Sequence, residues 1–315
     1  MLLYQVLDSF LGSVSHSSIY SIWEQTKTCT YKELIGFFKQ EYIDIDEINT
    51  AKDKLFNVKE GYLELDEIVL AKSKKDSDDF ILRRRKSAGG YIVNSVSIVL
   101  LIWTDGKIRV PIRIRIRKKA ESVGKSLLYL IGWYRNNINK KVEYITFDSA
   151  FSSKEVLTRI NDYGWCFVTK VAKTRKFNGK QVYRTHRGGY FEKIGYINTK
   201  FKVKVVRKED NFYITNRINL NRHKIEEMYS TRSIIEEVFR ILKQTCHWDH
   251  CQLRKYNDYE RFYITGCFEF LVLEYMRIKG FGTTIYKIRK QLLLGHVYAP
   301  LDEIERILAW FKYEL

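Results

Sequence analysis

The sequence predicts an α/β fold in which a mixed sheet is flanked by helices, with a β-rich insert and a small helical N-terminal segment. Three observations favour this fold class. Residues 61–171 show strand patterns first and then strands that alternate with helical patterns. Residues 172–222 contain short segments of alternating polarity, separated by Asn-Gly and Gly-Gly pairs. Residues 223–315 are helical in pattern. We therefore expect a helical segment over 1–60 and a core in two parts, 61–171 and 223–315, around an insert.

The N-terminal segment reads as three short helices, over residues 18–25, 30–40 and 44–56. Thr30 and Glu33 have the spacing of a capping box, which starts the second helix. The segment holds six Lys/Arg and nine Asp/Glu, a net charge of 6 − 9 = −3. Small helical segments often contact DNA, but this charge opposes such a contact. Packing or protein contact is the alternative, and the sequence leaves both open.

The first part of the core begins with three strands. The first covers residues 61–72 and contains Asp66 between apolar residues. A charged loop follows and ends at Gly89-Gly90. The next two strands, over 91–103 and 108–116, are joined by an Asp-Gly turn and form a hairpin. The third of these strands alternates apolar residues with Arg, which is the period of a half-buried strand.

Two helices and two strands complete this part. Helical patterns cover residues 120–137 and 152–163, whereas strands cover 142–147 and 165–171. Asp148 directly follows the fourth strand of the chain. The predicted order is three strands, a helix, a strand, a helix and a final strand. This is the order of an RNase H-like core. It predicts antiparallel pairing of the first three strands and parallel pairing through helical crossovers after them. The first and fourth strands are then neighbours.

Positive charge is concentrated in the insert. The whole chain has a net charge of +18 and a pI near 9.5. Residues 170–225 hold sixteen Lys/Arg and three Asp/Glu, a net charge of 16 − 3 = +13. Such a patch indicates a polyanionic partner, and interleaved Tyr and Phe residues suit nucleic acid. We expect Lys200, Lys202 and Lys204 to contact DNA. The alternative for each aromatic residue is a place in a small β core.

A helix over residues 229–243, YSTRSIIEEVFRILK, contains no Pro or Gly and many helix formers. At roughly 100° per residue, Tyr229, Arg232, Glu236 and Lys243 fall within an arc of about 60° on a continuous helix. An adjoining apolar stripe would dock the helix on a core. An amphipathic surface helix with a charged edge is the alternative. Residues 256–279 then predict a buried helix, and one or two more helices follow from residue 283.

Three carboxylates stand out in this arrangement: Asp66 inside a strand, Asp148 at a strand end and Glu236 on a helix. Slow phosphodiester cleavage is helped by a pair of metal ions about 3.5–4 Å apart. Mg²⁺ prefers carboxylate oxygen and water, so acidic side chains must be brought together from distant parts of the chain. Other aspartates near Asp66 lie in predicted loops, whereas a strand holds a ligand rigidly.

The chain resembles the DDE transposases of the insertion-sequence 4 group from about Gly61 to Arg277. Its Y-x2-R-x3-E-x6-K spacing is similar to that group's signature, and LELDEI and FDSAFSS resemble its two aspartate motifs. The resemblance implies that Asp66, Asp148 and Glu236 are catalytic and bind two Mg²⁺ ions, with Mn²⁺ able to substitute. It also implies that the Tyr, Arg and Lys of the signature, Tyr229, Arg232 and Lys243, hold DNA phosphates.

The resemblance further implies the reaction and its partners. We expect cleavage of double-stranded DNA at the ends of a mobile element, followed by strand transfer into target DNA, by a homodimer that bridges two ends. One alternative is a decayed or domesticated copy that binds DNA without cutting it. Another is a different RNase H-like nuclease, such as a junction resolvase. The N-terminal segment resembles no family that we can name.

The cysteines and the hydropathy of the sequence bear on the cellular location of the protein. The five cysteines have no regular spacing, which fits reduced thiols in a cytosolic protein. With the resemblance to DNA transposases, we expect a cytoplasmic protein associated with the nucleoid. The run Cys246-His247-Trp248-Asp249-His250-Cys251 holds zinc-ligand types but lacks finger spacing, so we expect a turn with buried thiols rather than a zinc site. No stretch of the sequence is apolar and long enough to predict a membrane span.

Overall fold

The computed structural model describes residues 3–13, 19–26, 29–40, 55–56, 60–72, 79–85, 92–138, 140–184 and 191–294. Contacts divide the chain into two units. Unit 1 takes Met1–Asn57, Val110–Ile112 and Glu237–Leu315, and unit 2 takes Val58–Arg109 and Arg113–Glu236. The predicted boundaries after residues 60, 171 and 222 stay predictions. Most of the predicted helix over 44–56 lies outside the described residues.

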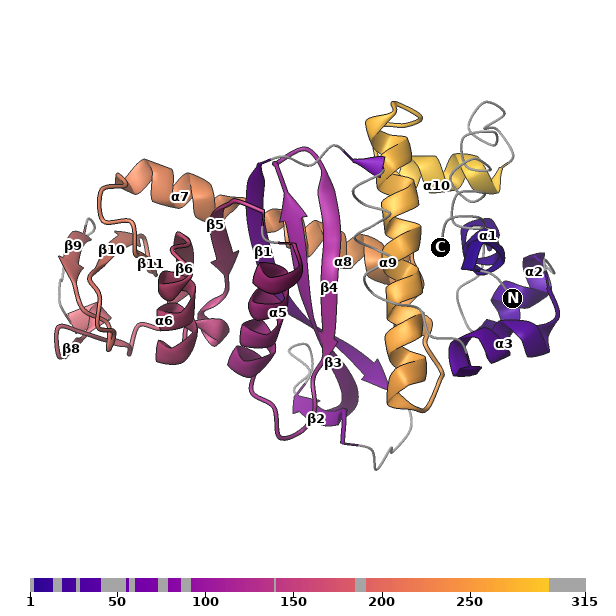
Figure 1. The fold of residues 1–315 in the computed structure, drawn as a ribbon, viewed down its shortest axis with the longest axis horizontal. Coiled ribbons are helices and arrows are strands. Elements are labelled where there is room, and N and C mark those ends of the chain that lie inside the picture. Colours follow the sequence, from indigo (N-terminus) through magenta and orange to yellow (C-terminus); the bar gives the residue numbers. More distant parts are fainter. Residues whose placement is uncertain are drawn as a thin grey trace. The chain divides into compact units, whose positions relative to one another are not determined.

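Unit 2 is built on a nine-stranded sheet (Figure 1). Its order is β2-β3-β1-β5-β6-β11-β10-β9, and β4 also pairs with β3. The strands are β1 (Gly61–Lys72), β2 (Ile81–Arg85), β3 (Ile92–Thr104), β4 (Arg109–Ile116), β5 (Val142–Phe147), β6 (Phe167–Val171), β9 (Phe191–Gly195), β10 (Val203–Lys208) and β11 (Asn211–Thr215). A separate small hairpin pairs β7 (Lys176–Phe177) with β8 (Lys180–Gln181).

The sheet is mixed, as the sequence predicts. β1 pairs with β3 antiparallel, whereas β1–β5 and β5–β6 pair parallel. Helices α5 (Val123–Asn137) and α6 (Lys154–Asp162) lie in the connections that lead to β5 and β6. Both begin at a serine whose hydroxyl accepts a backbone N–H of the first turn, which satisfies one of the free donors there. The fold class is therefore confirmed, and the first and fourth predicted strands are neighbours.

Two parts of the sheet differ from the prediction. β2 forms inside the stretch that reads as a charged loop, because its backbone pairs with β3 over five residues. The strands of the insert continue the main sheet, since β11 pairs antiparallel with β6 and is followed by β10 and β9. The basic segment and the aspartate-bearing strands thus share one sheet.

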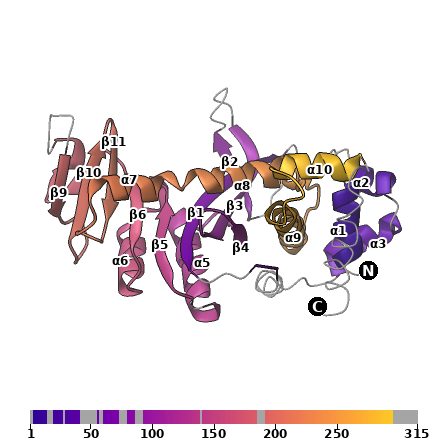
Figure 2. The same cartoon turned by 90° about the horizontal axis from the view of Figure 1, so that it is seen from above.

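Helices cover both faces of this sheet within unit 2. Figure 2 shows α5 and α6 on one side and α7 (Arg222–Ser230) on the other. Under α7, side chains of the sheet and helix form a buried cluster: Tyr62, Tyr144, Cys166, Val168, Val206, Tyr213, Ile225, Met228 and Tyr229. Short 3₁₀ turns follow β5 and β8, at η1 (Ser149–Phe151) and η2 (Val182–Arg184). The face that carries this cluster also carries the acidic residues considered below.

Unit 1 is helical around α9 (Tyr256–Ile278), which is buried along most of its length. Its other elements are α1 (Leu3–Gly12), α2 (Ile19–Thr26), α3 (Tyr31–Gln40), α10 (Ile285–Leu293), a 3₁₀ turn η3 (Trp248–His250) and most of α8 (Ser233–Gln244). Gly266 lets α9 pass Trp248, because an added Cβ would lie 2.5 Å from the indole nitrogen. The predicted capping box of α3 is confirmed by reciprocal hydrogen bonds between Thr30 and Glu33. Within the described part of the chain, no helix is both long and apolar enough to span a membrane.

Candidate active site

Asp66 and Asp148 come from neighbouring parallel strands. Leu65 of β1 lies opposite Phe147 of β5, so the residues that follow, Asp66 and Asp148, extend the same register. Alternation along a strand places both on the face that carries the cluster under α7. The parallel pairing of β1 with β5 therefore runs up to the residues that directly precede the two aspartates. The roles of both residues remain predictions.

Arg232 links two of the three predicted carboxylates. Its guanidinium forms one ion pair with Asp66 and another with Glu236, the latter with 2.7 Å between Nη1 and Oε1. Asp66 also accepts a backbone hydrogen bond from Glu67. The Glu236 side chain is 57% exposed, whereas that of Asp66 is only 15% exposed. Arg232 therefore joins a carboxylate held in the sheet to one that faces solvent.

The site has an excess of negative charge. Burial raises the pKa of Asp66 to about 6, with further upward contributions from the charges of Asp148 and Glu236 and an opposing one from Arg232. Within the described residues, the carboxylate of Asp148 makes no hydrogen bond or ion pair. One guanidinium thus faces three carboxylates, and this imbalance favours a further cation.

The donor set suits Mg²⁺, although Arg232 binds two of the three carboxylates. Asp66, Asp148 and Glu236 offer the oxygen ligands that Mg²⁺ prefers. Among the described residues no three acidic, His or Cys side chains are already gathered around one point. The Arg232 guanidinium holds Asp66 and Glu236 in the way that a metal cation would. Its departure from them would free both carboxylates for a divalent ion.

Glu64 is a buried carboxylate that sequence reasoning missed. It lies two residues before Asp66, on the same face of β1, and is completely buried. Its Oε2 accepts a hydrogen bond from the backbone N–H of Ile235 at 3.0 Å. Burial raises the pKa of Glu64 to about 8, and hydrogen bonds from Thr231 and Ile235 oppose this only in part. Glu64 therefore ties β1 to the start of α8, which carries Glu236. The sequence signal that could have identified Glu64 is the alternation Leu-Glu-Leu-Asp, which places Glu64 and Asp66 on the same face of the strand.

The predicted continuous helix over 229–243 is wrong. α7 ends at Ser230 and α8 begins at Ser233. The hydroxyls of Ser230, Thr231 and Ser233 each donate to a backbone carbonyl three residues earlier, at 2.7–3.1 Å. Such bonds compete with the regular helix ladder and favour a break. The predicted single arc of four side chains therefore does not exist, although Arg232 and Glu236 still meet across the turn.

Tyr229 consequently belongs to the core under α7. It is 8% exposed, and its ring centre lies 4.8 Å from that of Tyr213. Its hydroxyl is buried and has no hydrogen-bond partner among the described residues. Burial raises the pKa of Tyr229, so the phenol keeps its proton and is a donor. An unpartnered donor beside the carboxylates is consistent with a phosphate contact.

Lys170 is a second residue that sequence reasoning missed. Thr169 of β6 lies opposite Phe147 of β5, so Lys170 extends the row that holds Asp148. Its ammonium lies 5.4 Å from the centre of the Tyr229 ring and 5.9 Å from that of Tyr213. Within the described residues it forms no ion pair. A cation with free hydrogen-bond donors therefore flanks the aspartates, a placement visible only from the strand register.

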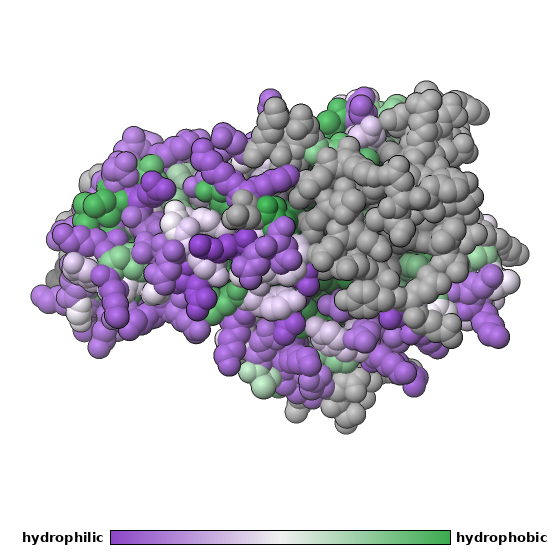
Figure 3. Space-filling model, in the orientation of Figure 1, coloured by the Kyte–Doolittle hydropathy of each residue, from purple (hydrophilic) through white to green (hydrophobic). Residues whose placement is uncertain are grey.

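The remaining predicted DNA contacts are spread over the chain. Lys200 and Lys202 are exposed between β9 and β10, where Figure 3 shows a largely hydrophilic surface. Lys204 differs, because its ammonium is buried and bound to Glu192 at 2.8 Å and to the carbonyl of Leu220. Its side chain is therefore committed inside the fold. Lys243 lies on α8 beyond Glu236, in unit 1, and is half-buried.

Comparison with known proteins agrees with the fold. A family model described as a transposase DDE domain matches residues 83–268, more than half of the chain. That range includes Asp148 and Glu236 and begins after Asp66. A cryo-EM structure of a piggyBac transposase synaptic complex with hairpin DNA is similar, with a TM-score of 0.57, 11% sequence identity, and coverage of 97% of this chain and 74% of that one. No curated protein matches the sequence. The chain therefore belongs to the family of transposases with a DDE domain.

Proposed function

We propose that this chain is a DNA transposase of the insertion-sequence 4 group, with an RNase H-like core, that cuts the ends of its own mobile element. The observation that carries the proposal is the pairing of β1 with β5, which sets Asp66 beside Asp148. The link through Arg232 from Asp66 to Glu236 adds the third carboxylate. Asp66, Asp148 and Glu236 would hold two Mg²⁺ ions, and Mn²⁺ would substitute.

The first reaction is hydrolysis of a phosphodiester at each transposon end. The oxygen of water forms a bond to phosphorus, and the bond from phosphorus to the 3′-oxygen breaks, which leaves a 3′-hydroxyl and a 5′-phosphate. In the second reaction this 3′-hydroxyl attacks a target phosphodiester and releases a target 3′-hydroxyl. Bound divalent ions would activate the attacking oxygen and stabilise the leaving one. Asp66, Asp148 and Glu236 orient both reactions because they hold fixed places on the sheet and on α8.

Cationic and phenolic groups around the carboxylates would position the DNA backbone. Arg232 can bind a phosphate with two parallel hydrogen bonds once it leaves the carboxylates, a geometry that lysine cannot reproduce. Among the residues that the structure describes, the buried hydroxyl donor of Tyr229 has no partner and the nearby ammonium of Lys170 forms no ion pair. Lys243 would contact a phosphate farther along the DNA. These groups orient the scissile phosphate and do not bind metal.

The insert would supply sequence-independent affinity. Lys200 and Lys202 are exposed in the segment whose net charge is +13, so they are available to phosphates. Lys204 is excluded from this role by its buried pair with Glu192. We propose a homodimer on DNA, because two ends of one element must be held together before strand transfer.

The test is metal-dependent cleavage of DNA that carries the inverted repeats flanking this gene. Purified protein should nick that DNA with Mg²⁺ or Mn²⁺ and should not nick it after chelation. The Asp148→Asn variant is the matched control, because it removes one ligand while the basic surface remains. DNA binding without cleavage under any divalent ion would instead indicate a decayed DNA-binding copy. Cutting of branched DNA in preference to repeat-bearing ends would indicate a different nuclease.

A further inference from the structure

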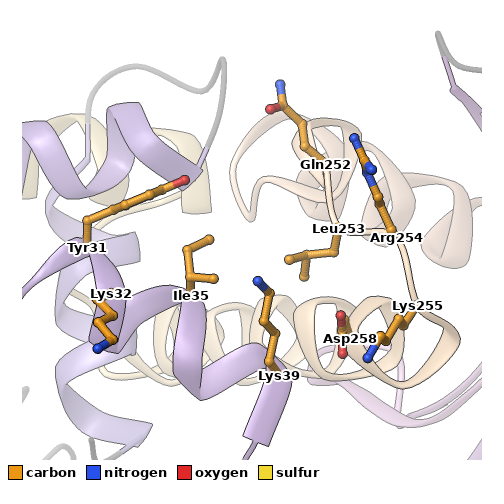
Figure 4. Close-up of a pocket in the computed structure, with 9 residues that line it drawn as sticks. All are labelled: Tyr31, Lys32, Ile35, Lys39, Gln252, Leu253, Arg254, Lys255 and Asp258. Atoms are coloured by element: carbon orange, nitrogen blue, oxygen red, sulfur yellow. The ribbon is translucent and has the colours of Figure 1, made fainter.

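Unit 1 contains a pocket of about 570 Å³ that the carboxylate site does not use. It lies between α3 and the segment that leads into α9 (Figure 4). Tyr31 and Ile35 form one side, and Leu253 and Arg254 form the other, while the ammonium of Lys39 lies between Ile35 and Leu253. The pocket therefore has apolar walls and a cation near its base. Its volume is within the range of small-molecule sites and suffices for a nucleotide unit.

The described lining of the pocket is strongly basic. Lys32 and Lys39 come from α3, and Arg254 and Lys255 come from the segment before α9, against the single carboxylate of Asp258. All four cationic residues are exposed. None of them forms an ion pair with another described residue, in contrast to Lys204, whose ammonium is neutralised by Glu192. Four cations around one opening, in a unit whose residues 1–57 are net acidic, favour an anionic ligand.

Exposed aromatic rings adjoin the pocket. Tyr20 and Trp23 of α2 pack with Tyr31 of α3, with ring centres 5.4–5.7 Å apart. Tyr20 is 48% exposed and Tyr31 is 37% exposed, so large ring faces meet solvent. The indole N–H of Trp23 donates to the carbonyl of Cys29 at 2.8 Å and fixes this cluster at the start of α3. Aromatic rings held in place and nearby cations are the two components of a surface on which bases stack.

We propose that this pocket binds a nucleic-acid strand with unpaired bases, with its phosphates at Lys39, Arg254 and Lys255 and a base against Tyr31. The apolar walls formed by Ile35 and Leu253 suit the flat, uncharged part of a nucleotide, and the cations suit its phosphate. Unit 1 would thus contain a second nucleic-acid binding site, formed by other residues than the carboxylates of unit 2. This inference rests on the proposed function in one respect, which is that the bound strand is DNA.

The experiment uses the full chain and a labelled oligodeoxythymidine, with fluorescence anisotropy as the readout. A Lys39→Gln/Arg254→Gln/Lys255→Gln variant should bind the strand about tenfold or more weakly. The matched control is Lys279→Gln/Lys287→Gln/Lys290→Gln, which removes the same charge from exposed positions of unit 1 outside the pocket. The control should lose no more than about threefold. Equal losses in the two triple variants would overturn the pocket as a binding site.

Substitutions of Tyr31 distinguish the contribution of base stacking from that of charge. Tyr31→Ala should weaken binding of the single strand about fivefold or more, while Tyr31→Phe should restore it, because the ring face is what stacks. An unchanged affinity for Tyr31→Ala, or an equal loss for a duplex of the same length, would contradict the unpaired-base proposal. Cleavage of transposon ends is measured separately on the wild-type protein. A protein that binds the strand through this pocket but never cuts DNA would leave this inference standing and refute the proposed function.

Discussion

Two regions of the molecule place an arginine against carboxylates. They differ in the number of carboxylates that face the arginine and in the access of solvent to the group. In unit 1, Arg289 donates to Glu269 and to the carbonyls of Phe10 and Ser13, and lies 3.1 Å from the Nε2 of His247. Glu269 and His247 are almost completely buried, and Arg289 is 5% exposed. These partners come from α1 and the residue that follows it, from α9 and from the turn before η3, so Arg289 joins them to its own helix, α10.

In unit 2, Arg232 faces Asp66 and Glu236, with Asp148 directly after the neighbouring strand β5. Here one cation meets three carboxylates, and Glu236 is largely exposed. The difference is the one expected between a group that holds the fold together and a group that serves the proposed reaction. The Arg289 cluster is closed to solvent and has one carboxylate per arginine, whereas the Arg232 site is open on one side and short of positive charge. A divalent ion could replace Arg232 at the carboxylates, and a DNA phosphate could bind the released guanidinium, whereas neither has access to Arg289.

The largest effect should follow from removing an aspartate of the open site. Asp66→Asn and Asp148→Asn should each lower cleavage roughly 10³-fold or more, because each removes a metal ligand. Metal-free stability should be unchanged or slightly raised, since neutralisation relieves repulsion between carboxylates. Cleavage assays and thermal melts of the same samples check both parts. A variant that loses cleavage only because it unfolds would break the comparison.

The closed cluster should respond in the opposite way. Arg289→Met leaves Glu269 buried without its charged partner, and we expect a loss of about 3–5 kcal/mol in the free energy of unfolding. Urea denaturation of the full chain measures this loss. Lys290→Met is the control, because Lys290 is exposed on the same helix and should change little. Equal stabilities of the two variants would show that the Arg289 cluster does not stabilise the fold.

Arg232→Lys should have a smaller effect, limited to DNA handling. We expect cleavage of transposon ends to fall about 10- to 100-fold, because lysine cannot make two parallel hydrogen bonds to one phosphate. The fold should survive, as a positive charge still faces Asp66 and Glu236. Arg240→Lys, at an exposed position of α8, serves as the control. Near-normal cleavage by Arg232→Lys would count against the phosphate role.

The smallest effect concerns pH. Burial raises the pKa of Asp66 to about 6 and that of Glu64 to about 8, so the folded state binds protons that the unfolded state has already released. Metal-free stability should therefore fall as the pH rises from about 4 to about 8, because the unfolded state releases these protons first. Urea titrations with chelator present measure the slope. The Asp66→Asn/Glu64→Gln variant should show a flatter slope, and an unchanged slope would assign the dependence to other groups.

The sequence predicts well what depends on local pattern. Alternating apolar residues locate β1 and β5, and the rule that crossovers run through helices makes these strands neighbours, which is how Asp66 and Asp148 could be placed together. Pairing between distant segments is less visible. The five residues of β2 read as a charged loop, because their strand state depends on the β3 backbone. The same holds for β11, which extends the main sheet only through its pairing with β6.

The site shows the same limit at the level of single side chains. The break between α7 and α8 arises from three hydroxyls in the run Ser230-Thr231-Arg232-Ser233, whereas helix propensity alone favours continuity. Glu64 could not be assigned, because its partner is the backbone N–H of Ile235, 171 residues away. The position of Lys170 beside the aspartates likewise follows only from the register of β6 against β5. Residue types were visible in the sequence, but their partners required the fold.

The matched pair Glu236→Gln and Glu237→Gln tests the central claim most directly. The two residues are adjacent on α8 and both exposed, but they point about 100° apart, and Arg232 binds Glu236. Magnesium-dependent cleavage and gel-shift binding are measured for both variants with the same transposon-end DNA. We predict that Glu236→Gln loses cleavage and keeps DNA binding, whereas Glu237→Gln cleaves nearly as well as the wild-type protein. Normal cleavage by Glu236→Gln, or loss of cleavage only in Glu237→Gln, would contradict the placement of Glu236 in the active site.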